Sequence, residues 1–304
     1  RGRGKEPTEE AKAKVARGPV VGSKDELGAW LAQNGVVWAD TALAMRSPGE
    51  VPVNEPKVEQ GIVDGWGIVS TQSIDAGVEL FRVPRKACFG AKAATSDAED
   101  AASMRVDSQR RLAALLLRER GSEQWGRALA WLPQEPAPLA WAWPEREAAE
   151  LLAGTELQAP VEAKRARLSA ELSQKTDESE CDLPTDLSLE EYINASAVCL
   201  SHANPWFGGT MVPFVSLLNA GTEAHVEFSV SFDREWVVGV AARPIPAGIE
   251  VRQSYGDDIS CADLLYRYGF CFLREKPSSE DVVSVTVAHL TEALGAEGEA
   301  GGEG

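Results

Sequence analysis

Two tyrosines, thirteen residues apart, are the side chains of this sequence best suited to chemistry. Tyr255 stands in a Ser-Tyr-Gly turn, and Tyr268 opens the tripeptide Tyr-Gly-Phe. A tyrosine hydroxyl both donates and accepts hydrogen bonds, so it can hold a reacting group in place without itself reacting. A single tyrosine is more often a core residue with a satisfied hydroxyl. The pair therefore has to be judged together with the segments around it.

The segments next to the tyrosines predict how the two side chains are held. Ser260 is followed three residues later by Asp263, a capping-box-like start for a short helix that runs to Arg267. Upstream, the segment Gly248–Gly256 begins with a turn and ends at Tyr255. We therefore expect Tyr268 at the end of a helix and Tyr255 in the turn before it.

The wider pattern of apolar residues places strands on both sides of a helical block. Lys24–Gln33 predicts a first amphipathic helix. Strand-like runs occupy 61–63, 67–70, 78–83, 225–232 and 236–242. From about 105 to 203 the pattern is helical, with stretches at 111–120, 145–153, 161–172 and 189–200. The loop Leu132–Pro144 in this block, with the residue before it, is rich in tryptophan, at 131, 141 and 143. Packing between helices and sheet explains such a cluster more often than a binding surface does. The order predicts an α+β fold with helices inserted into a split β domain.

Charge and cysteine usage exclude several classes of function. The net charge of −17 disfavours nucleic acid as the main partner, because phosphate binding needs clustered lysine and arginine. An acidic surface favours basic protein partners, although solubility alone explains it more simply. The five cysteines are widely spaced, which predicts neither a zinc site nor a disulfide framework. The sequence holds no apolar run long enough to span a membrane.

Read in order, four segments of the chain resemble the SET domain of protein-lysine methyltransferases. They are Asp64–Gly67, Ile74–Pro84, Val212–Asn219 and Gly248–Gly256. The resemblance is closest to the branch that contains the Rubisco large-subunit lysine methyltransferase, and it covers roughly 58–275. The chain is thus identified as an α+β SET-domain protein, with a β core at about 58–90 and 210–275 and a helical insert at about 100–205.

The resemblance also implies a domain plan. A SET domain would span 23–290, between a flexible N-terminal tail, 1–22, and a low-complexity tail, 291–304. Members of this branch usually continue into a helical substrate-binding domain. We expect that domain to be missing or truncated here, because the sequence stops soon after Val282–Val287.

A methyl-transfer site is the further implication of this resemblance. The cofactor would be S-adenosylmethionine, the acceptor a lysine of a protein substrate, and the site would need no metal. Positioning is expected to supply most of the rate of such an in-line displacement. Tyr255 matches the family's catalytic tyrosine, and Tyr268 matches the tyrosine that lines the lysine channel. The positions that align with the family's cofactor contacts are Asp64, Trp66, His202, Asn219 and Ala220.

Three cofactor positions depart from the family pattern. Ala220 stands where the family has histidine, Ser216 where it usually has aspartate, and His202 where it has arginine. The backbone N–H and C=O of Ala220 remain available. Exchanging arginine for histidine removes a fixed cation, a charge-assisted bond worth about 1.5–3 kcal/mol. Together these changes predict cofactor affinity lower by roughly two to three orders of magnitude.

Two functions remain open from the sequence. One is an active protein-lysine N-methyltransferase; the other is a catalytically degenerate SET-fold scaffold in a larger assembly, such as a plastid transcription complex. The first residue is Arg1 rather than Met, which is compatible with a removed targeting peptide. With the resemblance, this predicts the chloroplast stroma, with cytoplasm and nucleus as alternatives. No direct nucleic-acid binding and no membrane association are expected.

Overall fold

The computed structural model describes residues 23–47, 66–91, 106–129, 132, 139–173, 183–184, 186–256, 259–272 and 279–281. The predicted tails, Asp64, and the runs 61–63 and 282–287 lie outside these residues. The chain forms two compact units. The first comprises Arg1–Ala137 and Gln174–Ser254, and the second comprises Pro138–Ser173 and Tyr255–Gly304.

Within the described residues, the first unit contains the strands and four helices. Its strands are β1 (Val37–Trp38), β2 (Leu43–Arg46), β3 (Gly67–Ser70), β4 (Glu79–Pro84), β5 (Ala203–Asn204), β6 (Thr210–Met211), β7 (Val226–Val230) and β8 (Trp236–Ala241). Its helices are α2 (Lys24–Gln33), α4 (Val106–Glu119), α5 (Gly126–Leu129) and α8 (Leu189–His202), with 3₁₀ turns η2 (Arg85–Ala87), η4 (Trp206–Gly208) and η5 (Val215–Leu217). The second unit contains η3 (Ala140–Ala142), α6 (Glu145–Leu151), α7 (Gln158–Ser173) and α9 (Cys261–Tyr268).

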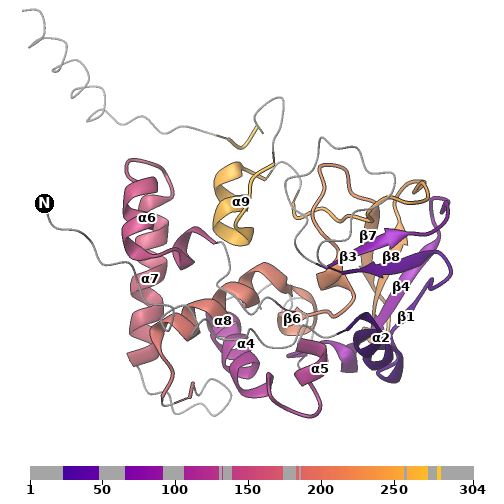
Figure 1. The fold of residues 1–304 in the computed structure, drawn as a ribbon, viewed down its shortest axis with the longest axis horizontal. Coiled ribbons are helices and arrows are strands. Elements are labelled where there is room, and N and C mark those ends of the chain that lie inside the picture. Colours follow the sequence, from indigo (N-terminus) through magenta and orange to yellow (C-terminus); the bar gives the residue numbers. More distant parts are fainter. Residues whose placement is uncertain are drawn as a thin grey trace, which may run out of the picture. The chain divides into compact units, whose positions relative to one another are not determined.

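The main sheet joins segments that are distant in sequence. Its strands follow the order β1-β4-β8-β7, and every neighbouring pair is antiparallel (Figure 1). In the β4–β8 register, Phe81 lies opposite Gly239, where a Cβ would come within 2.3 Å of the Phe81 ring. The glycine therefore leaves room for the buried ring of Phe81, and strands from both ends of the chain share one core. The prediction of an α+β fold is confirmed.

Two strands come earlier than the sequence indicated. β1 pairs with β4, and β2 pairs with β3, so the sheets begin at Val37 rather than near residue 58. β1 has two residues and β2 has four, which is too short for an alternating pattern to stand out. β2 also ends at Arg46, a buried charged residue that a polarity pattern would place in solvent.

Helices α4 and α8 form the helical layer of the first unit. The two helices pack against each other (Figure 1). Leu112 and Leu116 of α4 and Tyr192 of α8 are almost wholly buried, and burial of such a side chain contributes about 1.5–3 kcal/mol. A capping box at Ser188 starts α8: its hydroxyl accepts from the Glu191 N–H, and the Glu191 side chain accepts from the Ser188 N–H.

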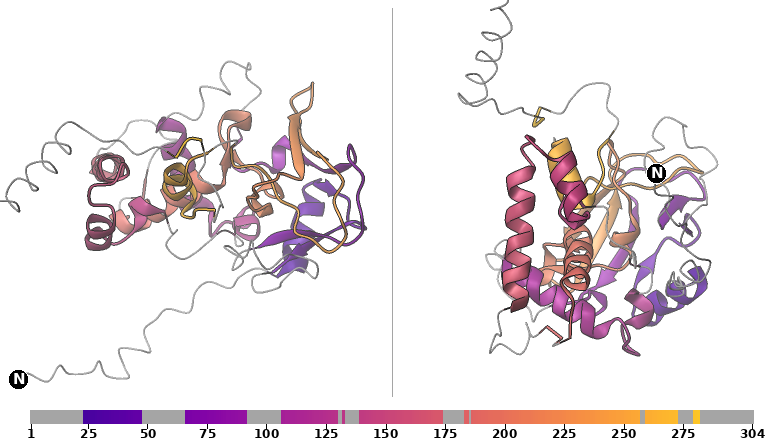
Figure 2. Two further views of the ribbon diagram at one scale, coloured as in Figure 1. Left: turned by 90° about the horizontal axis from the view of Figure 1, so that it is seen from above. Right: turned by 60° about the vertical axis from the view of Figure 1, so that its left-hand side comes forward.

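The second unit is built around a buried tryptophan. Trp141 exposes 0% of its surface, and its indole N–H donates to the Tyr266 carbonyl at 3.0 Å. Lys164 lies over the same ring, with its nitrogen 5.0 Å from the ring centroid. Helices α6 and α7 lie side by side (Figure 2). Packing therefore accounts for Trp141, as predicted, while Trp131 lies outside the described residues.

Candidate functional site

Asn219 links two of the predicted cofactor segments in the first unit. Its side-chain nitrogen donates to the Trp66 carbonyl at 3.0 Å and to Oε1 of Glu250 at 2.7 Å. Both partners are acceptors, so the amide must present its NH₂ group to them, and this fixes which way the amide oxygen points. Trp66 and Asn219 lie 153 positions apart in the sequence, and the fold places them in direct contact.

A buried charged cluster lies under this contact. Glu250 exposes 2% of its surface and forms an ion pair with Arg46, at 3.0 Å from Nη2 to Oε1. Its second oxygen faces Nε of Arg252 at 3.4 Å. At Gly67, a Cβ would lie 2.5 Å from Oε1 of Glu250, so this glycine gives room to the ion pair.

Sequence reasoning missed Arg46 and Glu250. Glu250 lies inside the segment Gly248–Gly256, but nothing in the adjacent sequence marks its side chain as buried rather than exposed. Arg46 ends a strand that the sequence did not reveal. The signal that would have found Arg46 is its place opposite Gly67 in the β2–β3 register, and that register is visible only in the fold.

Ala220 supplies backbone groups beside Asn219. It forms a parallel bridge with Gln253, in which the Gln253 N–H donates to the Asn219 carbonyl at 2.9 Å and the Gly221 N–H donates to the Gln253 carbonyl at 3.1 Å. This bridge uses the groups on either side of Ala220. Ala220 itself is 8% exposed, and its own N–H and C=O make no hydrogen bond to any residue that the structure describes. It therefore retains an adjacent donor and acceptor for a ligand.

His202 ends α8 as an uncharged residue. Burial lowers the pKa of its imidazole to about 4, so the ring is neutral near pH 7. Its carbonyl accepts from the hydroxyl of Ser216 at 3.5 Å and from the side-chain nitrogen of Asn204 at 3.4 Å. Ser216 also donates to the Val212 carbonyl at 3.0 Å. His202 is thus uncharged at pH 7 in the ligand-free protein, and the Ser216 hydroxyl contacts the carbonyl of this last residue of α8.

The two predicted tyrosines meet in the second unit. The rings of Tyr255 and Tyr268 lie 4.3 Å apart between centroids, and Phe270 lies 6.2 Å from the first and 6.3 Å from the second. Helix α9 begins at the Ser260 cap and ends at Gly269 in the left-handed conformation, which leaves Tyr268 as its last residue. Burial raises the pKa of Tyr268, so its hydroxyl keeps its proton at neutral pH.

The structure therefore forms two clusters from the predicted site residues. Asn219, Ala220 and Trp66 belong to the first unit, and Tyr255 and Tyr268 belong to the second. His202 also lies in the first unit, where its carbonyl contacts Ser216, three residues before Asn219. Asp64 lies outside the described residues.

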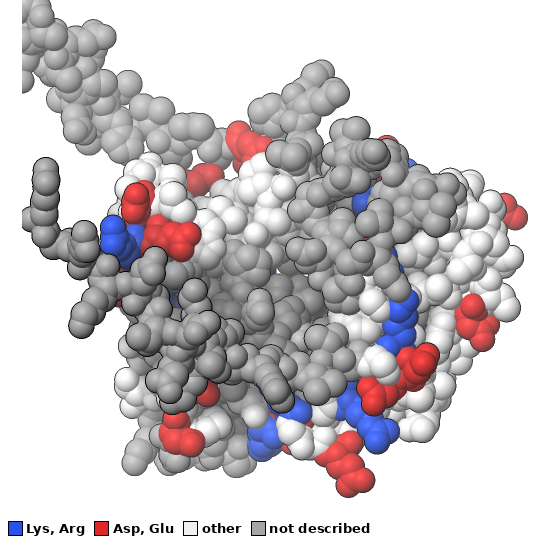
Figure 3. Space-filling view, in the orientation of Figure 1, with Lys and Arg blue, Asp and Glu red and all other residues white. Residues whose placement is uncertain are grey.

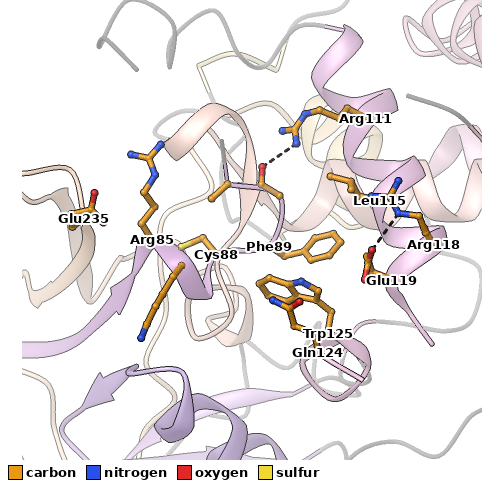
Figure 4. Close-up of a pocket in the computed structure, with 13 residues that line it drawn as sticks. Arg85, Cys88, Phe89, Arg111, Leu115, Arg118, Glu119, Gln124, Trp125 and Glu235 are labelled. Atoms are coloured by element: carbon orange, nitrogen blue, oxygen red, sulfur yellow. Dashed lines mark hydrogen bonds and ion pairs between the residues drawn. The ribbon is translucent and has the colours of Figure 1, made fainter. Parts of the chain in front are cut away.

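A large cavity in the first unit lies apart from these residues. Its volume is about 950 Å³, and none of the predicted site residues lines it. Phe89 and Trp125 form one wall, with their rings 5.1 Å apart and nearly perpendicular (Figure 4). Arg111 is held by the Gly90 carbonyl at 3.0 Å (Figure 4). The cavity is a feature of the packing between η2 and α4 and is not the candidate site.

The described part of the chain contains neither a candidate metal site nor a candidate membrane span. There, His, Cys, Asp and Glu side chains do not gather in groups that could hold a metal ion. None of the helices described combines the length and the apolar character that a membrane crossing requires. On the face in Figure 3, acidic and basic side chains of the described residues are interspersed. The nucleic-acid prediction stays untested.

Comparison with known proteins points to a single fold. No family model matches the chain. The mouse N-lysine methyltransferase SETD6 is 28% identical over 278 residues, covering 76% of this chain and 54% of that protein. The human protein of the same name is 27% identical over 267 residues, covering 79% and 54%. The chain therefore spans about half the length of these relatives.

Solved structures agree at lower sequence identity. Rubisco LSMT bound to AdoMet superposes with a TM-score of 0.60 and 21% identity, covering 84% of this chain and 57% of that one. The SET domain of LSMT bound to lysine and AdoHcy gives a TM-score of 0.58 and 20% identity, covering 82% and 57%. These similarities show that the two strand segments and the helices between them follow the fold of those structures.

Proposed function

We propose that this SET-domain protein, similar in fold to Rubisco LSMT, is a protein-lysine N-methyltransferase that uses S-adenosylmethionine. The observation that carries the proposal is the contact of Asn219 with Trp66, which joins two segments expected at the cofactor. The relatives named as lysine methyltransferases support a lysine of a protein as the acceptor.

The residues of the first unit fit such a cofactor. Ala220 presents an unused N–H and C=O side by side, a pattern that matches the edge of an adenine ring. The amide oxygen of Asn219 accepts no hydrogen bond from the described residues, while its NH₂ group is fully occupied, so the oxygen is left for an ammonium group. The bound cofactor would supply a methyl group on a positively charged sulfur.

The residues of the second unit would position the acceptor. The rings of Tyr255 and Tyr268 lie next to each other, in a cluster with Phe270. Neutral hydroxyls can accept from an amine and orient it without taking part covalently. The aromatic rings would exclude water from an amine that must react in its uncharged form. In this proposal Tyr255 contacts the reacting atoms, and Tyr268 lines the channel.

A scaffold function is the second candidate, and the neutral His202 favours it. A cation at this position would add a charge-assisted bond to the carboxylate of the cofactor, worth about 1.5–3 kcal/mol. With its pKa near 4, His202 supplies none of this at pH 7. A SET fold that binds cofactor weakly, or not at all, would then serve as a subunit of a larger assembly.

Calorimetric titration of S-adenosylmethionine and S-adenosylhomocysteine into the purified chain tests the two candidates. Micromolar binding is expected if the backbone contacts of Ala220 suffice. The double variant His202→Arg, Ala220→His should bind tighter by at least tenfold. The matched control is Ala44→His, which adds a histidine at an exposed position of β2. A wild-type chain that binds neither ligand, with binding restored in the double variant, would favour the scaffold.

Catalysis needs a separate measurement. Transfer of labelled methyl groups from S-adenosylmethionine to basic proteins should be lost in Tyr255→Phe while cofactor affinity is unchanged. Equal transfer by wild type and Tyr255→Phe would contradict the assigned role. The chloroplast location and the plastid assembly stay predictions: the curated relatives are mammalian proteins and lend them no support. Fractionation of source cells with an antibody to the chain would test the location.

A further inference from the structure

We propose that Glu250 is a positioning residue for the methyl-donor site. It would act through Asn219, which it orients, without touching the cofactor itself. The inference rests on the proposed function, because it assigns a role to a residue behind the same site. It is carried by a set of contacts that converge on one buried carboxylate.

The first step is the geometry around Asn219. An amide NH₂ group has two protons, and here one goes to the Trp66 carbonyl at 3.0 Å and the other to Glu250 at 2.7 Å. With both protons used, rotation of the amide would break two hydrogen bonds at once. The amide oxygen is therefore held in one direction, and Glu250 supplies the shorter of the two bonds that hold it.

The second step is the anchoring of Glu250 itself. Its side chain is 1% exposed, and Arg46, with 2% of its side chain exposed, pairs with the same oxygen at 3.0 Å. Arg252 approaches the other oxygen, with Nε at 3.4 Å and Nη2 at 3.5 Å. A carboxylate between two guanidinium groups and an amide has its position over-determined. Because Glu250 is held in place, its hydrogen bond holds the Asn219 amide in place as well.

The third step connects the Trp66–Gly67 segment, at the start of β3, to the same group. Gly67 is the register partner of Arg46, and a Cβ on it would meet both Oε1 of Glu250 and Nη2 of Arg46, at 2.5 and 2.8 Å. The start of β3 thus lies directly against the ion pair. The carboxylate that holds the Asn219 side chain therefore also lies beside the Trp66–Gly67 backbone, whose Trp66 carbonyl accepts from Asn219.

The chain offers a matched control for a Glu–Arg pair. Glu79 and Arg82 form an ion pair of 2.6 Å at the surface, with side chains 39% and 46% exposed. The two pairs use the same residue types and differ in burial and in the contact with Asn219. Glu250→Gln and Glu79→Gln each remove one charge with almost no change of shape.

The test is a double-mutant cycle on cofactor affinity with S-adenosylhomocysteine as the probe. Glu250→Gln should weaken binding at least tenfold, and Glu79→Gln less than twofold. Asn219→Ala should also weaken binding, and adding Glu250→Gln to it should change the dissociation constant less than threefold further. A residue that acts through Asn219 loses its effect when Asn219 is absent. Independent losses that multiply in the double variant would overturn the proposal.

Side-chain amide hydrogen exchange at Asn219, followed by NMR in the ligand-free chain, keeps the two proposals separable. The Asn219 NH₂ protons should be protected in wild type and in Glu79→Gln, and at least tenfold less protected in Glu250→Gln. If the wild type binds no cofactor, the proposed function fails and this measurement alone decides the role of Glu250. Unchanged protection in a folded Glu250→Gln chain would refute the positioning role.

Discussion

Gly67→Ala is the sharpest perturbation of the structure, because it adds one methyl group at a fully specified place. The new Cβ would lie 2.5 Å from Oε1 of Glu250, 2.8 Å from Nη2 of Arg46 and 3.0 Å from its Nε. In an exposed pair such long side chains would swing aside at little cost. Here both side chains are at most 2% exposed and paired with each other, so the clash cannot be relieved toward solvent.

The size of the effect follows from the two ways in which the clash can be relieved. A shift of β3 against β2 is overpacking, which costs about 1–3 kcal/mol. Separating the pair and leaving an uncompensated buried charge costs about 3–5 kcal/mol, which sets the upper limit. We therefore expect a loss of about 2 kcal/mol in the free energy of unfolding. Unfolding entropy is about 2.1 cal/mol/K per residue, so for the 304 residues of this chain the loss lowers Tm by about 3 °C.

Urea unfolding followed by circular dichroism, without cofactor, measures the loss. The matched control is Gly121→Ala, where the added Cβ has no neighbour within 4 Å, and its stability should stay within about 0.5 kcal/mol of wild type. The absence of cofactor matters: a glycine needed only for approach of a ligand would leave the free protein as stable as before. Equal stabilities of Gly67→Ala and Gly121→Ala would refute the close approach.

Three further predictions concern single side chains. The pKa of His202 is lowered to about 4, so on acidification the unfolded chain gains a proton before the folded chain does. The free energy of unfolding should therefore fall as pH drops from about 6.5 to about 4. A pH series of urea unfolding should show a smaller loss in His202→Asn. Ser260→Ala removes the hydroxyl that caps α9 and should cost about 1 kcal/mol in urea unfolding, whereas Ser173→Ala at the exposed end of α7 should cost less than half of that. Burial, followed by the neighbouring Cys261 thiol, raises the pKa of Cys271 to about 11, so its alkylation by iodoacetamide should be slow near neutral pH and still accelerate above about pH 9; a plateau near pH 9 would contradict this.

Local signals in the sequence were sufficient for the helices. The first amphipathic helix has the predicted bounds, Lys24–Gln33, and α9 starts at the predicted Ser260 cap. Capping and 3.6-residue periodicity depend on neighbours in sequence, so they can be read without the fold. The contact between Tyr255 and Tyr268 is also local in sequence, because a short helix and its turns are enough to bring the two rings together.

Long-range contacts were predictable only through the resemblance, and in part not at all. The resemblance placed Trp66 and Asn219 at the same ligand, and the structure shows their hydrogen bond. Nothing local separates Glu250 from the many exposed glutamates of this acidic chain, since burial of a charge is set by its partner. That partner, Arg46, lies 204 positions away. Short strands such as β1 were not predicted for the same reason: a two-residue strand is recognisable only by its pairing partner, here β4.

The separation of Arg46 from Glu250 also determines when the site can form during synthesis. A ribosome that adds about 5–20 residues per second needs roughly 10–40 s to cover the 204 positions between them. Through that interval β2 and β3 can pair, but Arg46 lacks its contact with Glu250 and Trp66 lacks its contact with Asn219. Contacts of such high sequence separation close slowly, because loop entropy must be overcome first. We expect the nascent chain to remain dependent on chaperones until the segment Gly248–Gln253 has emerged.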